Sequence, residues 1–210
     1  MLKIDSEFDR VKNISMKNEK NFLISHGYKD DRDVYILGSF VELMKMGSQV
    51  FPEYFIKFKP PEPDFHTYVS DKKFYKQIEI VENMHWGRKR GKEDEVSFDR
   101  SKYSEASKRC QIRIWYSFIK NLNDKFLKFY GKDSWLVIYH NINVFHISDI
   151  GFWINIIFGI KEEIEKRGLV DFSKSTYEKI FVLNSGFTEL VQIFPDNRVI
   201  FSKYAQYLLK

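Results

Sequence analysis

Residues 63–81 read PDFHTYVSDKKFYKQIEIV and contain two strand-like runs separated by a turn. The first run, 64–69, follows a proline-rich turn, and the second, 74–81, is rich in β-branched and aromatic residues. The Asp-Lys-Lys sequence at 71–73 favours a tight turn between them. The stretch therefore predicts an antiparallel hairpin, and the rest of the fold can be read outward from it.

The segments on either side of the hairpin complete a mixed α/β pattern. A helix is predicted from Asp33, as its N-cap, to Gly47, as its stop, and a strand at 50–58 follows it. After the hairpin we expect a long helix at 104–130 and then a strand at 135–139, whose continuous apolar run is typical of burial on both faces. The order helix, strand, strand, strand, helix, strand predicts a mixed central sheet flanked by helices.

The remaining sequence is expected to extend this core within a single domain, 1–210. Residues 1–32 are predicted to form an N-terminal helical extension, 33–140 the core, and 141–210 a C-terminal helix and strands that complete the domain. The elements expected in the last part are a helix at 151–167, strands at 178–184, 187–194 and 198–201, and a terminal helix.

The composition excludes several classes of protein. Apolar side chains make up 43% of the 210 residues and charged side chains 30%, which is typical of a globular chain. No run approaches the roughly 18 consecutive apolar residues of a membrane span, so a channel or transporter is excluded and no membrane partner is expected. The single cysteine, Cys110, excludes a disulfide framework, and the charged N-terminus does not match a secretory signal, so we expect a cytoplasmic protein. The net charge of +5 permits a polyanionic partner.

Three acidic residues are placed where they could meet at one site. Glu42 lies on the first helix, Asp64 at the start of the first hairpin strand and Glu79 in the middle of the second. Strict alternation puts Glu79 on the face opposite to Phe74 and Ile78, at a height similar to that of Asp64 across the turn. Because an unpaired buried carboxylate is costly, a cation or another partner is expected at Glu79. Carboxylate oxygens suit Mg²⁺ or Mn²⁺, which can polarise a phosphodiester and activate a water.

At these residues the chain resembles the PD-(D/E)xK nuclease superfamily, which includes restriction endonucleases and many DNA-repair nucleases. The resemblance covers about 33–140 and rests on Pro63-Asp64, the spacing of 15 residues to Glu79, the helical Glu42 and the order of the elements. It implies a restriction-endonuclease-like core of αβββαβ order with N- and C-terminal additions. It also implies that Asp64 and Glu79 bind the metal while Glu42 assists, and it makes a homodimer one possible assembly.

Val81 departs from the pattern of that superfamily, in which a lysine two residues after the glutamate orients or activates the attacking water. An apolar side chain cannot do this, and three explanations stay open. The lysine has moved to the long helix, where Lys125 is the best candidate and Gln111 lies on nearly the same stripe. Alternatively, Gln77 replaces it from the same strand face as Glu79, or catalysis has been lost.

A basic loop follows the hairpin, and its cationic and aromatic side chains are candidates for contact with nucleic-acid phosphates or bases. These candidates are Trp86, Arg88, Lys89, Arg90 and Lys92. Acidic residues are interleaved with them, so a solvated loop without a binding role is an equal alternative.

We therefore expect a magnesium- or manganese-dependent nuclease that hydrolyses phosphodiester bonds, with DNA as the expected substrate. Asp64, Glu79 and either Lys125 or Gln77 would carry the catalysis. One alternative is an inactive protein of the same fold that binds nucleic acid or another protein. Another is an unrelated α/β interaction domain, in which Glu79 would face solvent.

Overall fold

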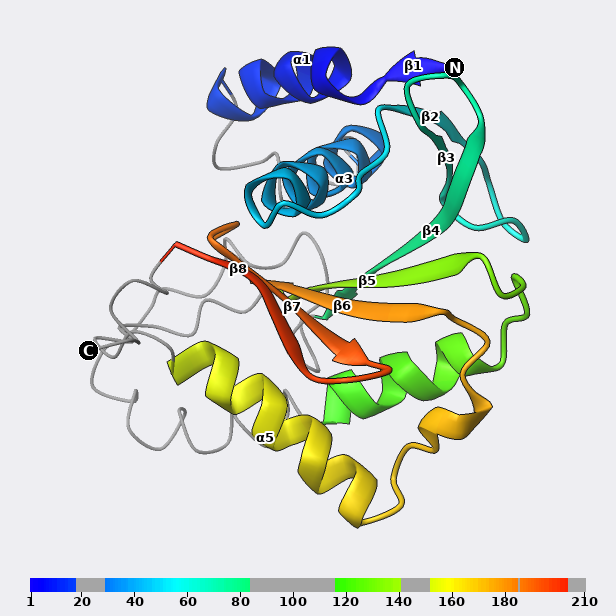
Figure 1. Cartoon of the computed structure of the whole chain (residues 1–210), viewed down its shortest axis with the longest axis vertical. Coiled ribbons are helices and arrows are strands. Elements are labelled where there is room, and N and C mark those ends of the chain that lie inside the picture. The colour runs from blue at the N-terminus through cyan, green and yellow to red at the C-terminus, as the bar shows by residue number, and fades with distance from the viewer. Residues whose placement is uncertain (18–28, 84–115, 141–151, 185, 204–210) are drawn as a thin grey trace, which may run out of the picture.

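A single mixed sheet of eight strands organises the chain, and neighbouring strands follow the order of the sequence (Figure 1). The computed structural model describes residues 1–17, 29–83, 116–140, 152–184 and 186–203. The strands are β1 (Leu2–Lys3), β2 (Tyr54–Lys57), β3 (Phe65–Tyr68), β4 (Phe74–Asn83), β5 (Ser134–His140), β6 (Lys179–Asn184), β7 (Glu189–Phe194) and β8 (Arg198–Ser202).

The middle of the sheet is parallel and both of its sides are antiparallel. β4 pairs in parallel with β5, and β5 with β6, whereas every other neighbouring pair is antiparallel. Parallel neighbours require a crossover connection, and each of these two connections contains a helix. The helix at 116–126 precedes β5, and α5 (Phe152–Lys166) precedes β6. The protein is thus an α/β protein with a mixed sheet, and the predicted order of elements up to β5 is confirmed.

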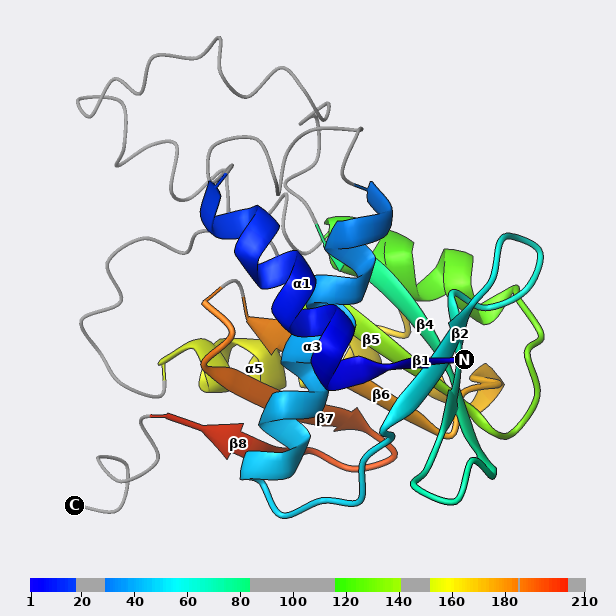
Figure 2. The ribbon, with the colours of Figure 1, turned by 90° about the horizontal axis from the view of Figure 1, so that it is seen from above.

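Helices cover both faces of the sheet. α1 (Ile4–Lys17) and α3 (Lys29–Met46) lie on one face, and the helix at 116–126 lies with α5 on the other (Figure 1). A short 3-10 helix, η4 (Phe172–Lys174), follows α5. The view from above shows α1 beside α3 over the sheet (Figure 2).

Two apolar cores result from this three-layer arrangement, one on each face. The core beneath α3 contains the rings of Phe40, Trp135 and Phe181, whose centroids lie 5.2–6.3 Å apart. The opposite core contains Leu136 and Ile157. Every residue of β5 is buried, because its successive side chains enter the two cores in turn. This confirms the burial on both faces that its apolar run predicts.

α1 approaches α3 closely at Gly38. A Cβ atom at this position would lie 2.4 Å from the ring of Phe8 on α1. The contact between the two helices therefore requires a residue without a side chain at position 38.

Several element boundaries differ from the sequence-based expectation. α3 begins at Lys29, so Asp33 lies inside the helix and is not its N-cap. β2 occupies only 54–57 of the run expected at 50–58. The helix expected to continue to 130 ends at 126, where the N–H of Lys128 bonds the carbonyl of Lys125 and tightens the last turn.

The prediction of strict alternation along β4 is wrong in the first half of the strand. The β3–β4 register shifts opposite Thr67, whose hydroxyl bonds both the carbonyl and the N–H of Lys76. As a result Tyr75, and not Phe74, faces the α3 side, where its ring lies 5.4 Å from that of Trp135. The second half of β4 alternates as expected.

Two parts of the predicted secondary structure lie outside the described residues: 104–115 of the long helix and most of the terminal helix, at 204–210. Among the residues that the structure describes, no helix combines the length and the apolar character that a membrane span needs.

Candidate functional site

Asp64 and Glu79 lie directly opposite each other on neighbouring strands. Phe65 pairs with Ile78, so the same register places Asp64, one residue before β3, across from Glu79. The Asp64 carboxylate accepts a hydrogen bond of 2.8 Å from the backbone N–H of Ile80. The hairpin therefore brings the two carboxylates to the same height, as the sequence predicts.

Glu79 is buried, with 3% of its surface exposed, so the alternative in which it faces solvent is wrong. Its side chain points to the face covered by the helix at 116–126. Two ammonium groups reach the same oxygen: Lys125, in the last turn of that helix, makes a short contact, and Lys128, two residues after its end, lies 3.0 Å away. This pairing explains how a carboxylate is tolerated in the sheet, since two cations offset its desolvation.

The pKa of Asp64 is raised from 3.8 to about 6. Burial is the largest cause, followed by the negative charge of Glu79, while the hydrogen bond from Ile80 and the charge of Lys125 act in the opposite direction. Asp64 and Glu79 repel each other where they are partly desolvated. Binding of a cation between the two carboxylates would remove this repulsion and is therefore favoured.

Asp33 is a further carboxylate whose charge acts on one member of this pair, although its place in the sequence predicts only a helix cap. Its charge also raises the pKa of Asp64. The side chain is 14% exposed, and its Oδ2 lies 3.0 Å from the ammonium group of Lys57 at the end of β2. α3 thus presents its N-terminal part, and not its middle, to the beginning of β3.

Glu42 is not part of this arrangement. It is exposed on α3, and nine residues of helix place it about 13 Å along the axis from Asp33. Its charge acts on Tyr35, whose pKa is raised mainly by burial and secondarily by Glu42. The structure therefore does not bring Glu42 to the acidic pair, and the α3 carboxylate whose charge acts on Asp64 is Asp33.

Gln77 and Val81 share the sheet face of Glu79 and lie on either side of it. The Oε1 atom of Gln77 accepts a hydrogen bond of 3.0 Å from Ser134, so this amide is held by the neighbouring strand. Val81 packs against the core beneath the helix at 116–126. A positively charged side chain at this site therefore has to come from another element, and Lys125 provides it.

Tyr177 is close to the acidic pair, although no sequence signal distinguishes it from the other tyrosines. It is 2% exposed, and its hydroxyl is buried without a hydrogen-bond partner among the described residues. Burial chiefly raises its pKa, and the charges of Glu79, Tyr130 and Asp64 add to the effect. Its ring centroid lies 6.2 Å from that of Tyr130, which in turn lies beside the Lys128 ammonium group.

The donor set of this site fits a hard cation in kind but is incomplete in number. Asp64 and Glu79 offer the carboxylate oxygens that Mg²⁺ or Mn²⁺ prefers. Within the described parts of the chain, no three His, Cys, Asp or Glu side chains are close enough together to hold one ion. Water and substrate oxygens commonly complete a magnesium site, so two carboxylates are a sufficient start.

The remaining candidates lie outside the described residues. These are Gln111 and the basic-loop residues Trp86, Arg88, Lys89, Arg90 and Lys92.

No family model, curated protein or solved structure matches this chain. The function is therefore argued from the geometry of the site.

Proposed function

We propose that the protein is a divalent-metal-dependent nuclease with a restriction-endonuclease-like core, acting on DNA. The observation that carries the proposal is the contact of the Lys125 ammonium group with Glu79, directly opposite Asp64. A lysine beside two carboxylates is the combination that the PD-(D/E)xK superfamily, which the chain resembles, uses for phosphodiester hydrolysis, and here it is assembled from a helix and a hairpin. The order α3, β2, β3, β4, helix at 116–126 and β5 supports the same core.

Asp64 and Glu79 would hold the Mg²⁺ or Mn²⁺ ion, and Asp33 is a further carboxylate whose charge acts on Asp64. The bound ion would supply polarisation of the phosphate and a water that ionises more readily. Hydrolysis forms a bond from the water oxygen to phosphorus and breaks the bond to the leaving oxygen, which takes up a proton.

Lys125 is the residue that we assign to the water and the phosphate. Its ammonium group has three N–H donors, and Glu79 uses only part of this capacity. The remaining donors can orient a water or neutralise a phosphate oxygen next to the acidic pair. Gln77 is the weaker candidate, because its Oε1 already accepts from Ser134.

A second candidate function is a non-catalytic binding module with the same core. The observation that favours it is the double ion pair at Glu79, which neutralises the carboxylate without a metal ion. In this case the lysines would be structural, and the protein would bind nucleic acid or another protein without cleaving it.

Two measurements on the full chain separate these functions. Calorimetric titration with MnCl₂ should show binding that is lost in Asp64→Asn. Nicking of supercoiled plasmid in MgCl₂ should be lost in Asp64→Asn and in Lys125→Met but kept in Glu42→Gln, which changes an exposed carboxylate of α3. Circular dichroism checks that each variant is folded.

Full nicking activity in both Asp64→Asn and Lys125→Met would overturn the site assignment. A wild-type protein that neither binds manganese nor cleaves plasmid, single-stranded DNA or RNA would overturn the nuclease proposal and favour the binding module.

A further inference from the structure

The chain from Leu127 to Lys132 carries two conspicuous apolar side chains on the surface. Leu127 is 87% exposed and Phe129 is 83% exposed, and no other large apolar side chain in the described residues is as exposed. Exposing a leucine and a phenylalanine so completely is unfavourable, which makes this segment a candidate for contact with a ligand.

These two side chains flank a residue that contacts the proposed active site. Lys128, between them, lies 3.0 Å from Glu79, and its carbonyl accepts a hydrogen bond of 2.9 Å from Thr176. The following residue, Tyr130, lies against the buried Tyr177. Alternate residues thus turn inward to the site, while Leu127 and Phe129 project outward beside it.

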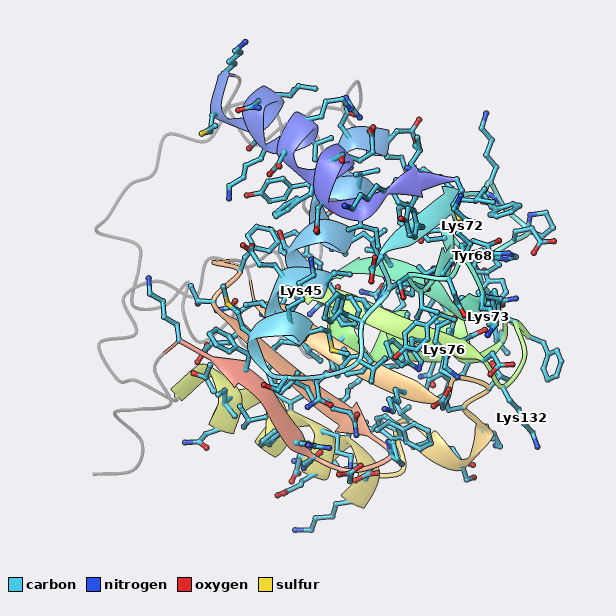
Figure 3. The ribbon with its side chains drawn as sticks, turned by 45° about the horizontal axis from the view of Figure 1, so that its top comes forward. Lys45, Tyr68, Lys72, Lys73, Lys76 and Lys132 are labelled. Carbon is cyan, nitrogen blue, oxygen red and sulfur yellow. The ribbon has the colours of Figure 1, made fainter. Side chains whose placement is uncertain are left out.

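Positive charge lies on the same side of the molecule. Lys132 follows the segment, and Figure 3 shows it on the same side as Lys72, Lys73 and Lys76 of the β3–β4 hairpin. Lys76 is neutralised by Asp133 and Glu178, and Lys73 by Asp71. Lys72 and Lys132 are exposed, and neither pairs with a carboxylate among the described residues.

We propose that the surface formed by Leu127, Phe129 and Lys132 binds a single-stranded segment of nucleic acid at the point of cleavage. This inference rests on the proposed nuclease function and adds the form of the substrate. The exposed ring of Phe129 stacks on a base, Leu127 packs beside it, and Lys132 contacts the phosphate backbone.

A single strand is favoured over a duplex because stacking needs a free base face. In a duplex both faces of each base are covered by its neighbours, and unstacking a base costs a few kcal/mol. Stacking on an aromatic side chain tolerates any base, so this surface confers a preference for strand form and not for sequence.

The test is the affinity of the metal-free full chain for nucleic acid, measured by fluorescence anisotropy. The probes are a fluorescein-labelled single-stranded oligodeoxynucleotide of about 15 nucleotides and the matching duplex. We expect the wild-type protein to prefer the single strand. Phe129→Ala should weaken single-strand binding by roughly 5- to 100-fold and change duplex binding little, whereas Phe129→Trp should keep the wild-type affinity. Val199→Ala, which alters an exposed apolar residue of β8, is the matched control.

Equal affinity of Phe129→Ala and the wild-type protein for the single strand would overturn the inference, and so would an equal loss on both probes. A lower molar mass of Phe129→Ala in light scattering, with unchanged oligonucleotide affinity, would also overturn it by assigning the surface to self-association. Because no cleavage is measured, a failure of this inference can be told apart from a failure of the nuclease proposal. If the protein bound the single strand selectively but did not nick DNA, the binding role of this surface would stand and the nuclease proposal would be overturned.

Discussion

Lys125 contacts the carboxylate of Glu79 although 46 residues separate them in the chain. The lysine lies at the end of the helix at 116–126, and the glutamate lies in the middle of β4. Position 81, where the superfamily that the chain resembles carries its lysine, is filled by a valine that packs in the core. The cation of the site is thus supplied by a helix and not by the strand.

Lys125→Met should lower the rate of DNA cleavage by about 100-fold or more, because the group that orients the water would be lost. The fold should survive, since Glu79 keeps its contact with Lys128. Initial rates of plasmid nicking at saturating MgCl₂ measure the effect. Lys120→Met, which removes an exposed lysine paired with Asp124 on the same helix, should cleave at the wild-type rate. A Lys125→Met protein as active as this control would contradict the assignment.

Asp33→Asn should weaken metal-dependent activity by about 10-fold, because the negative charge that it removes acts on Asp64, a proposed metal ligand. The matched control is Asp30→Asn, because Asp30 pairs with the same lysine, Lys57, but is exposed. Glu42→Gln is the second control and should behave like the wild type. Activity as a function of MnCl₂ concentration distinguishes a loss of metal affinity from a loss of rate. If Glu42→Gln were impaired and Asp33→Asn were not, the original sequence-based choice would be restored.

Tyr177→Phe should reduce cleavage by about 5- to 10-fold, the value of one hydrogen bond to a ligand, if its hydroxyl donates to substrate or to metal-bound water. Its stability should not fall, because the hydroxyl has no partner in the described protein to lose. Thermal unfolding and nicking rates on the same preparation provide both values. Tyr75 lies on the other sheet face, and its hydroxyl donates a hydrogen bond to the carbonyl of Val50. The Tyr75→Phe protein loses this bond, so it should be less stable than the wild type but fully active. A Tyr177→Phe protein that unfolds earlier and cleaves normally would make Tyr177 a structural residue.

Local patterns predict most of the sheet, because strand formation here follows β-branched and aromatic runs broken by turn residues. The length of the hairpin predicts that Asp64 and Glu79 lie at similar heights, and the burial of β5 follows from its uninterrupted apolar run. Their direct pairing also depends on the bulge, because the register of Tyr68 with Phe74, continued without a shift, would place Asp64 opposite Ile78. The bulge in β4 was missed, since it depends on the hydroxyl of Thr67 bonding across to the neighbouring strand.

The helical contributions to the site are only partly predictable. A helical period places both Asp33 and Glu42 on α3, but which turn meets the hairpin depends on how the helix crosses the sheet. Lys125 could be predicted because Val81 stands where the superfamily that the chain resembles carries its lysine. A lysine is therefore expected on another element. Tyr177 lies just before β6, two strands away from β4, so only the tertiary structure brings it near Glu79.

The raised pKa of Asp64 predicts a pH-dependent contribution to stability. A carboxyl whose pKa is about 6 in the fold and 3.8 otherwise binds its proton more tightly in the native state. The free energy of unfolding should therefore fall by about 3 kcal/mol as the pH rises from about 4 to 6, and stay at that lower level above. Over the same pH range, the free energy of unfolding of Asp64→Asn should rise by about this amount relative to that of the wild type. Urea unfolding at several pH values measures this difference.

The comparison of these two proteins isolates Asp64. His140 is buried with its pKa lowered to about 4, so it contributes the opposite slope, but equally in both proteins. Saturating MgCl₂ should stabilise the wild type at pH 7 and leave Asp64→Asn unaffected, since the ion removes the repulsion between the carboxylates. If the difference in the free energy of unfolding between the two proteins did not change with pH, the surroundings of Asp64 would not raise its pKa.

Gly38→Ala should destabilise the protein by about 1–3 kcal/mol, because the new methyl group would lie 2.4 Å from the ring of Phe8 and force α1 away from α3. Gly159→Ala on α5 is the matched change, since a Cβ there meets nothing within 4 Å. It should stabilise the protein by about 0.5–1 kcal/mol through the better helix propensity of alanine. Urea unfolding measures both effects.

A double-mutant cycle with Phe8→Ala tests whether the clash is the cause. The cost of Gly38→Ala should fall in part in the Phe8→Ala background, because the ring atoms at 2.4 Å are gone while the Cβ of residue 8, which alanine keeps, would still lie 2.7 Å from the new methyl group. Additive effects of the two substitutions would mean that α1 does not pack on α3 at this glycine. Since Asp33 lies on the same helix, a displacement of α3 would also lower metal-dependent cleavage, whereas a displacement of α1 alone would leave it intact. The cleavage activity of Gly38→Ala, measured at a temperature where the variant is folded, therefore shows whether α3 or α1 is displaced.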